Sequence, residues 1–168
     1  FTCSGTIVFT EILSISGTVT INGGGNIILD GGGQVSFFSV WGNSSSLILN
    51  DLTLQNGYTD EYYDGLISIN ESTVVINNST INSHAITRGY GIIYNNGRLT
   101  ITNSIFSDNS RTIIYNRGRL NITNSIFSDN KWDMYGTAVY NTESGTTTIG
   151  SSSFSNNSGE YGGAITNG

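Results

Sequence analysis

A stretch of thirteen residues occurs twice in this chain, and it restricts the possible folds more than any other feature. Gly97–Asn109 reads GRLTITNSIFSDN, and 21 residues later Gly118–Asn130 reads GRLNITNSIFSDN, so twelve of the thirteen positions are identical. A segment repeated at so short an interval is typical of an array in which each repeat forms one small unit and packs on its neighbours.

Looser copies of the same pattern run along nearly the whole chain. Gly145–Asn157 fits well, Ser72–Asn82 fits more loosely, and Leu47–Leu54 and Thr18–Leu29 share the alternation of apolar and polar residues. The central aliphatic residue of each copy serves as a marker, and successive markers lie 21 to 28 residues apart. The markers are Ile21, Leu49, Ile76, Ile101, Ile122 and Ile149. We therefore expect a single domain, residues 1–168, of about six units.

Each clear unit contains three short segments with the period of a β-strand. In the unit that begins at Gly97, Leu99 and Ile101 alternate with threonines, Ser104–Ser107 is the second segment and Thr112–Asn116 is the third. No window has the periodicity of a long amphipathic helix. Three short strands per unit predict an all-β fold, a right-handed parallel β-helix (solenoid) of about six coils. Each strand then pairs with its copy in the next coil.

Equivalent positions in successive units predict the core of this β-helix. Besides the markers, we expect two further apolar columns: Leu54, Ile81, Phe106, Phe127 and Phe154, and Ile93, Ile114, Val139 and Ile165. Asparagine recurs in a column at the end of the third strand: Asn95, Asn116, Asn141 and Asn167. A set of corner positions follows the markers: Asp51, Asn78, Asn103 and Asn124. Stacked amides can hydrogen-bond along the axis, and asparagine tolerates the left-handed backbone of tight corners.

Charge and composition argue against several classes of partner. The net charge of −6 disfavours nucleic acid and an anionic membrane surface, and no apolar run is long enough for a transmembrane helix. Cys3 is the only cysteine, so no disulfide can form within the chain. We expect Cys3 to be a small buried residue near the first strand. An intermolecular bridge or a reactive thiol is the alternative.

The repeats resemble a broad group of secreted or surface-attached proteins of bacteria and archaea, the adhesin-like and polymorphic-outer-membrane-protein-like repeat proteins. Their F-x-x-N and GGAI signatures are matched here by Phe154–Asn157 and Gly162–Ile165, and less strictly by Phe106–Asn109 and Gly91–Ile93. The resemblance covers nearly the whole chain and implies the pectin-lyase-like right-handed parallel β-helix. It says little about function, because the repeat is scaffold.

The fold also hosts polysaccharide lyases and polygalacturonase-like hydrolases, and their catalytic patterns are missing here. There is no adjacent aspartate pair, no Gly-His-Gly and no basic strand motif. A cluster of Asp60, Glu61 and Asp64 could bind Ca²⁺ loosely, but a solvated loop is the better interpretation. The single histidine, His84, is interpreted as a loop or capping residue. We predict no enzyme, no catalytic residue, no metal and no cofactor.

The segments between the second and third strands vary in length and are rich in aromatic residues, which could contact a glycan or another chain. These candidates are Tyr58, Tyr62, Tyr63, Tyr90, Trp132, Tyr135 and Tyr161. Packing beneath the loops is the alternative role. N-x-S/T triplets mark candidate glycosylation sites at Asn43, Asn70, Asn77, Asn78, Asn121 and Asn156.

These observations predict a non-catalytic structural or adhesive module that is extracellular or on the cell surface. No capping helix is expected at either end. Two interpretations follow from this: the chain is a segment of a longer surface protein, or its open coils associate end to end, in the manner of a filament subunit. Surface glycans are a second candidate partner; nucleic acid and membrane insertion are not expected. The alternative function is a carbohydrate-binding or polysaccharide-degrading, lyase-like module.

Overall fold

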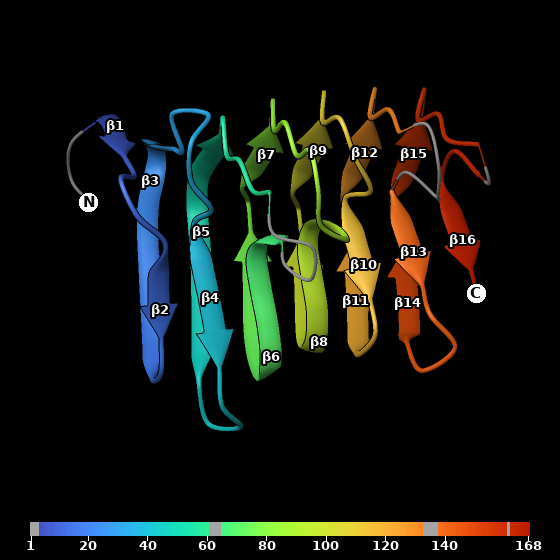
Figure 1. Cartoon of the computed structure of the whole chain (residues 1–168), viewed down its shortest axis with the longest axis horizontal. Helices are drawn as coiled ribbons and strands as arrows, with labels where there is room; N and C mark the ends of the chain where they lie inside the picture. Colours follow the sequence, from blue (N-terminus) through green and yellow to red (C-terminus); the bar gives the residue numbers. More distant parts are fainter. Residues whose placement is uncertain (1–3, 61–64, 133–137, 161) are drawn as a thin grey trace.

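The computed structural model describes residues 4–60, 65–132, 138–160 and 162–168. It is a β-solenoid of about six coils, and its described residues form sixteen strands and no helix (Figure 1). Every strand pairing among them is parallel. No helix long and apolar enough to cross a membrane occurs in the described ranges. The predicted all-β parallel solenoid is confirmed.

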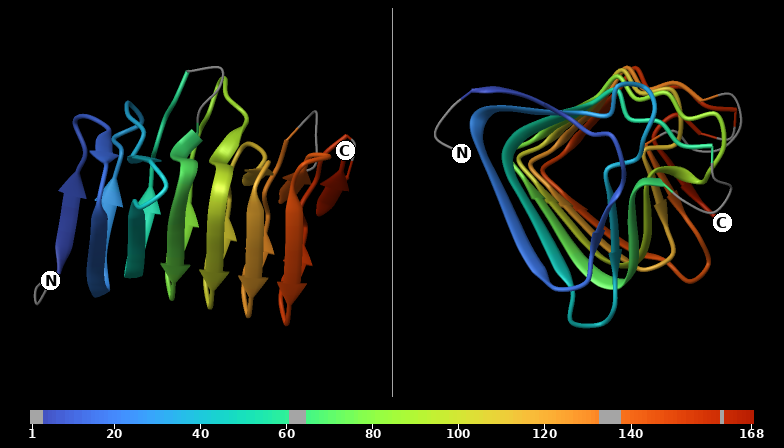
Figure 2. Two further views of the ribbon diagram at one scale, coloured as in Figure 1. Left: turned by 90° about the horizontal axis from the view of Figure 1, so that it is seen from below. Right: turned by 60° about the vertical axis from the view of Figure 1, so that its left-hand side comes forward.

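The strands form three faces, and the view close to the axis shows a roughly triangular outline (Figure 2). Face 1 holds the first halves of β3 (Thr18–Asp30) and β5 (Ser46–Gln55), the second halves of β6 (Gly65–Asn77) and β8 (Gly91–Thr102), β11 (Arg119–Thr123) and β14 (Thr146–Gly150). Face 2 holds β1 (Gly5–Val8), the second halves of β3 and β5, β7 (Thr80–Asn82), β9 (Ile105–Ser107), β12 (Ile126–Ser128) and β15 (Ser153–Ser155). Face 3 holds β2 (Leu13–Ile15), β4 (Phe38–Trp41), the first halves of β6 and β8, β10 (Ile114–Asn116), β13 (Val139–Asn141) and β16 (Ile165–Asn167).

Four strands are longer than the sequence pattern suggests, because they continue through a corner from one face to the next. β3 and β5 pass from face 1 to face 2, and β6 and β8 pass from face 3 to face 1. The pairing register shifts at both kinds of corner, between Asn22 and Ile27 and between Asn70 and Thr73. A local irregularity therefore bends the ladder there without interrupting it.

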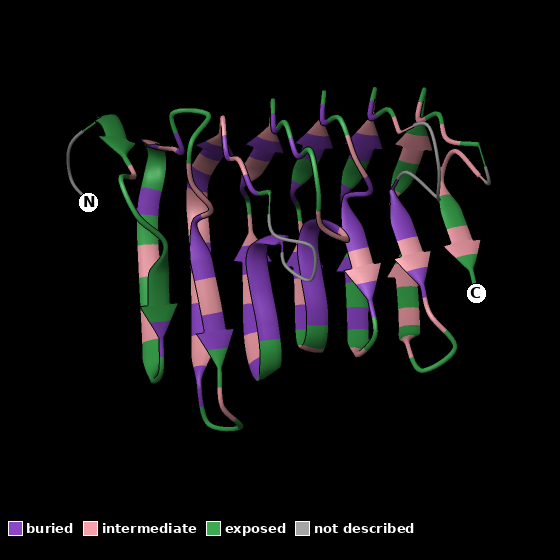
Figure 3. Cartoon of the chain, viewed as in Figure 1, coloured by how far each residue is buried: buried purple, intermediate pink, exposed green. Residues whose placement is uncertain are grey.

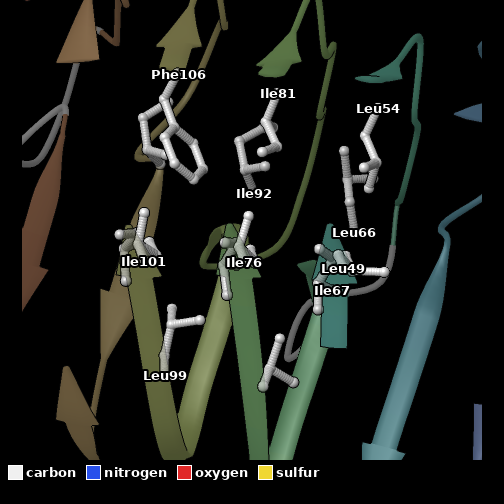
Figure 4. Close-up of a cluster of buried hydrophobic side chains, with 14 of the residues drawn as sticks. Leu49, Leu54, Leu66, Ile67, Ile76, Ile81, Ile92, Leu99, Ile101 and Phe106 are labelled. Atoms are coloured by element: carbon white, nitrogen blue, oxygen red, sulfur yellow. The ribbon is translucent and has the colours of Figure 1, made fainter. Parts of the chain in front are cut away.

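The register of the three predicted apolar columns is confirmed, and their members are buried except in the terminal coils, where Ile165 is exposed. Leu49, Ile76, Ile101 and Ile122 are direct strand partners and almost fully buried. Figure 4 shows the first three of them. The phenylalanines of face 2 stack with nearly parallel rings, at centroid distances of 4.7 Å for Phe106 and Phe127 and 5.0 Å for Phe127 and Phe154. Each buried large side chain stabilises the fold by about 1.5–3 kcal/mol. This core lies in the interior shared by the three faces, and burial is lowest in the terminal coils (Figure 3).

The corner after each marker adopts the left-handed backbone that the sequence predicts. Asp51, Asn78, Asn103 and Asn124 have φ values between 49° and 53°. The amide of Asn103 also donates to Oδ1 of Asn78 over 3.1 Å. A short polar side chain tolerates this conformation better than most residues, so these positions fix where face 1 turns into face 2.

The predicted amide column on face 3 is also confirmed and forms a continuous chain of hydrogen bonds. Nδ2 of Asn95 donates to Oδ1 of Asn116 (2.6 Å), Asn116 donates to Asn141 (2.8 Å), and Asn141 donates to Asn167 (2.8 Å). Asn95 and Asn116 are fully buried. We call this set the first amide ladder. It holds the last four strands of face 3 in register, because a slip of one residue would leave buried amides without partners.

Candidate functional site

A second amide ladder follows the strands of face 2, and the sequence analysis did not identify it. Nδ2 of Asn109 donates to Oδ1 of Asn130 (2.9 Å), and Asn130 donates to Asn157 (2.8 Å). The signal that could have identified it is the F-S-x-N spacing, which places an asparagine three residues after each stacked phenylalanine. In both ladders the side-chain amides hydrogen-bond to one another within the solenoid, so these asparagines have a structural role.

The single histidine continues this second ladder toward the N-terminus. His84 lies one coil before Asn109, and its backbone N–H donates to Oδ1 of Asn109 (3.2 Å). Its Nδ1 accepts a hydrogen bond from the N–H of Gly57 (2.8 Å), just as the asparagine Oδ1 atoms accept from the preceding coil. Only 2% of His84 is exposed. The predicted loop position is confirmed, but the side chain is a buried ladder member.

Burial also fixes the charge state of this imidazole. Desolvation lowers the pKa of His84 from 6.5 to about 3, and the Leu54 carbonyl and Asp30 offset the effect only in part. Phe37 packs edge-on against the ring, with centroids 5.7 Å apart. A neutral, buried imidazole whose Nδ1 already accepts a hydrogen bond is poorly placed to exchange protons with a substrate.

Of the aromatic residues predicted for the loop edge, only Tyr58, Tyr90 and Trp132 are described, and they make separate contacts. Tyr62, Tyr63, Tyr135 and Tyr161 lie outside the described residues, as does Cys3. The hydroxyl of Tyr58 lies 3.3 Å from Oγ1 of Thr87. Trp132 lies under the guanidinium of Arg111, which is 4.0 Å from the ring centroid. Partial burial there lowers the pKa of Arg111. Tyr58 and Trp132 thus contact neighbouring loops, which is the packing role that the sequence left open.

Tyr90 differs from the other loop aromatics, because it joins a column of tyrosines on the outside of face 3. Tyr94, Tyr115 and Tyr140 are strand partners in successive coils. Ring centroids are 6.0 Å apart for Tyr94 and Tyr115 and 5.1 Å apart for Tyr115 and Tyr140, and Tyr90 stacks on Tyr115 at 4.3 Å. Desolvation and the neighbouring hydroxyls raise the pKa of Tyr115. We call these four residues the tyrosine column.

The tyrosine column borders a groove of about 480 Å³ at its C-terminal end. Tyr115, Tyr140, Arg117 and Glu143 line this groove, and Nη1 of Arg117 donates to the hydroxyl of Tyr94 over 3.4 Å. The rings stack on one another, so the faces between them are occupied and their edges and hydroxyls remain for contact with a partner. The column therefore offers less stacking area to a sugar than four isolated rings would.

The candidate glycosylation sites lie mostly on the surface. Asn43, Asn70, Asn78, Asn121 and Asn156 are exposed, whereas Asn77 is half-buried. Asn77 donates to Oδ1 of Asn50 (3.0 Å), and Asn156 donates to Oδ1 of Asp129 (3.1 Å). Asn43 lies in the loop between β4 and β5, where a glycan would meet the least strand structure.

The acidic cluster that the sequence considered for Ca²⁺ is only partly described. Asp60 is exposed, and Glu61 and Asp64 lie outside the described residues. Within the described ranges, no group of three or more His, Cys, Asp or Glu side chains is arranged to hold a metal ion.

The first described coil presents an apolar surface on the side that, in later coils, is covered by the preceding coil. A groove of about 510 Å³ is lined by Ile7, Val8, Leu13 and Ile21 together with neighbouring residues. Exposed fractions are 38% for Ile7, 61% for Val8 and 43% for Leu13. No described strand pairs with the outer edges of β1 and β2. We call this the N-terminal end surface.

The last described coil presents the opposite ends of the same columns. Phe154 and Ile149 are only partly buried, and Ile165 is 47% exposed. The register connects Ile7 to Phe154 through face 2, Leu13 to Ile165 through face 3, and Ile21 to Ile149 through face 1. We call this the C-terminal end surface. The two end surfaces lie at opposite ends of the solenoid (Figure 1).

Comparisons with known proteins add no family to this description. No family model, no curated protein and no solved structure matches the chain. The resemblance to adhesin-like and polymorphic-outer-membrane-protein-like repeats therefore stays a prediction from the sequence motifs.

Proposed function

We propose that the chain is a non-catalytic structural or adhesive module of the extracellular surface, and that its coils stack end to end on a second copy. The observation that carries the proposal is the match between the two end surfaces. Each exposes the ends of the same three apolar columns and the edges of parallel strands. The C-terminal end surface of one copy can therefore continue the columns that begin at Ile7, Leu13 and Ile21 of the next.

The energetic reason for stacking is the same as the reason for the internal coils. Covering a large aliphatic side chain stabilises an interface by about 1.5–3 kcal/mol, and unpaired strand edges gain backbone hydrogen bonds when another strand is added. Such a head-to-tail contact does not close on itself, so it produces a fibre rather than a dimer. Because the chain carries a net charge of −6, added salt should promote stacking by screening repulsion between copies.

The test is analytical ultracentrifugation and negative-stain electron microscopy of the 168-residue chain at increasing concentration and salt. We expect fibres with an axial repeat of about 30 Å, the height of six coils spaced by about 4.8 Å. Leu13→Lys should abolish them, because it places a charge within the N-terminal end surface. Thr6→Lys is the matched control, since Thr6 is paired with Ile28 on the outward side of β1. A chain that stays monomeric under all these conditions contradicts the proposal.

The non-catalytic part of the proposal has its own test. His84 is held as a buried ladder member, and the amides of both ladders are bonded within the scaffold. We expect no shortening of pectate or other acidic polysaccharides and no unsaturated product after long incubation. Turnover that scales with protein concentration would show that the chain is an enzyme.

Carbohydrate binding is the second candidate, and the groove beside the tyrosine column favours it. Tyr115, Tyr140, Arg117 and Glu143 combine aromatic edges with charged hydrogen-bonding groups. Affinity electrophoresis in gels that contain polysaccharide tests this candidate. Tyr140→Ala should weaken any retardation, whereas Tyr58→Ala, a loop tyrosine that does not line this groove, should not. Equal retardation of both variants would exclude the groove.

A further inference from the structure

The cationic residues of this acidic chain are confined to one segment. All six lysine and arginine residues lie between residues 88 and 131, alongside two acidic residues, which gives this segment a net charge of +4. The rest of the chain holds ten acidic residues and no lysine or arginine. The middle coils of the solenoid are therefore positive, although the whole molecule is negative.

Two of these cations are stacked directly on one another. Arg98 of β8 and Arg119 of β11 are strand partners on face 1, one coil apart, and both are exposed. Parallel strands in register lie about 4.8 Å apart, and like charges at that distance destabilise a sheet. The flanking coils place threonines in the same column, since Thr73 pairs with Arg98 and Thr146 with Arg119. In the two middle coils arginine thus replaces threonine, although the two neighbouring positive charges repel each other.

Nothing in the described part of the chain neutralises this pair. Neither side chain makes a hydrogen bond or an ion pair with another described residue. Both arginines line a groove of about 480 Å³ at the corner between faces 3 and 1. Glu71 also lines it but forms no ion pair with them among the described residues. The guanidinium groups are therefore available to a ligand.

The corner glycines that line this groove let adjacent coils pack closely. A Cβ atom on Gly118 would lie 2.3 Å from the carbonyl oxygen of Gly97, and one on Gly97 would lie 2.4 Å from that of Ser72. The backbones of adjacent coils pack so closely that no side chain fits there. Arg98, Arg119, Thr73 and Thr146 all line this one groove, so a small ligand can contact both arginines in it.

We propose that Arg98 and Arg119 form a binding site for a tetrahedral oxyanion, a sulfate or phosphate group. Two guanidinium groups one coil apart can each donate to different oxygens of one such group, and charge-assisted hydrogen bonds of this kind are the strongest that side chains make. The bound anion also removes the repulsion between the arginines, so binding stabilises the middle coils.

The first test measures binding of inorganic sulfate at constant ionic strength, followed by NMR signals of the Gly97 and Gly118 amides. Sulfate should shift these signals in the wild type. Arg98→Gln and Arg119→Gln should each weaken the affinity about tenfold, as expected for a lost charge-assisted interaction. Lys131→Gln is the control, because it removes the same charge from an exposed residue outside the groove. Absence of a saturable shift, or equal weakening by Lys131→Gln, would overturn the proposal.

The second test uses the sign of the stability change. Without anion, Arg119→Gln should raise the melting temperature by about 1–2 °C, because it relieves the like-charge contact. With saturating sulfate, the same variant should melt below the wild type, since it has lost the ligand's contribution. A variant that is less stable than the wild type under both conditions would show that Arg119 has a purely structural role.

A third measurement identifies the source of the oxyanion. Glucose 6-sulfate is compared with inorganic sulfate, and glucose serves as the uncharged control. Tighter binding of glucose 6-sulfate identifies a sulfated glycan as the ligand, and equal binding identifies the free ion; both support the site. Binding of glucose alone with the same amide shifts would contradict it, because the arginines would then not recognise the anion.

Discussion

The inward column of face 3 changes its chemistry halfway along the solenoid. In the first three coils it consists of Ile15, Val40 and Ile69, and from the fourth coil it continues as the first amide ladder. Both halves are in register, and all their members except Asn167 are buried. The aliphatic half is held by burial and shape, the amide half by directional hydrogen bonds. One backbone geometry thus accepts two solutions to the same packing problem.

The two solutions differ in how strongly they define the register. Aliphatic side chains tolerate exchange for others of similar volume, whereas each buried amide requires a partner in the coil before and the coil after. The N-terminal half also uses a cluster of Phe9, Phe37 and Phe38, with ring centroids 5.2 to 6.3 Å apart. We therefore expect single substitutions to be most harmful in the amide half.

The largest effect is expected from Asn116→Val. This substitution replaces an asparagine of the first amide ladder with an aliphatic side chain like those in the first three coils of the column. Asn116 accepts from Asn95 and donates to Asn141, so its loss removes one hydrogen bond from each of these two buried amides. Nδ2 of Asn95 then keeps only the Arg119 carbonyl as a partner, and Oδ1 of Asn141 keeps only the Thr147 hydroxyl. We expect the free energy of unfolding to fall by about 3–4 kcal/mol. Urea denaturation followed by tryptophan fluorescence measures it. Ile69→Val in the aliphatic half is the control and should cost about 1 kcal/mol. Equal losses would show that the amides add no specificity.

A second pair of substitutions compares the corner between faces 3 and 1 in an early coil and in a late coil. Gly118→Ala places a Cβ atom 2.3 Å from the carbonyl oxygen of Gly97, and relief requires a backbone shift between two coils. We expect a loss of about 2–3 kcal/mol. Gly17 precedes the equivalent strand in an early coil and has open space around its Cβ position, so Gly17→Ala should change stability little. Thermal unfolding of both variants measures the two effects, and equal losses of stability would contradict the prediction.

The third prediction concerns His84, the ladder member that lies between the two halves. Its pKa is lowered to about 3 in the folded state, so between pH 6.5 and pH 3 the unfolded chain binds a proton that the folded chain does not. Stability should therefore be full above pH 6.5 and fall as the pH decreases. From pH 7 to pH 5 we expect a loss of about 2 kcal/mol.

His84→Asn supplies the comparison for that pH profile. Asparagine occupies this position in the following coils and can accept from the N–H of Gly57 in the same way. The variant should keep the fold and lose most of the dependence between pH 7 and pH 5, as measured by urea midpoints. A variant with an unchanged profile would assign the pH dependence to other groups.

Counting along the chain was enough to predict the fold and the registers of all three apolar columns. The register succeeded because each coil repeats the same alternation, and one wrong residue would have turned every side chain to the opposite face. The second amide ladder was missed although the F-S-x-N spacing marks its three asparagines, and only its histidine member lacks a signal in the sequence. That His84 is equivalent to these asparagines is visible only in the structure, where its Nδ1 occupies the place of an amide oxygen.

The candidate sites were harder to predict than the fold. Tyr90 reaches the tyrosine column from a loop whose length differs from those of its neighbours, so repeat counting could not place it. The arginine pair was overlooked for another reason. A net charge of −6 argues against anionic partners on average, and this average conceals a positive segment within an acidic chain.

Both amide ladders have a direction. In each, Nδ2 of one coil donates to Oδ1 of the coil that follows it in sequence. Together with the parallel strands, this gives the solenoid a polarity like that of a cytoskeletal filament. Because its two tips are chemically different, the stacked assembly that we propose would have no two-fold axis across its joints. Subunits would add to its two tips at unequal rates, and a seed would set the orientation of every later copy.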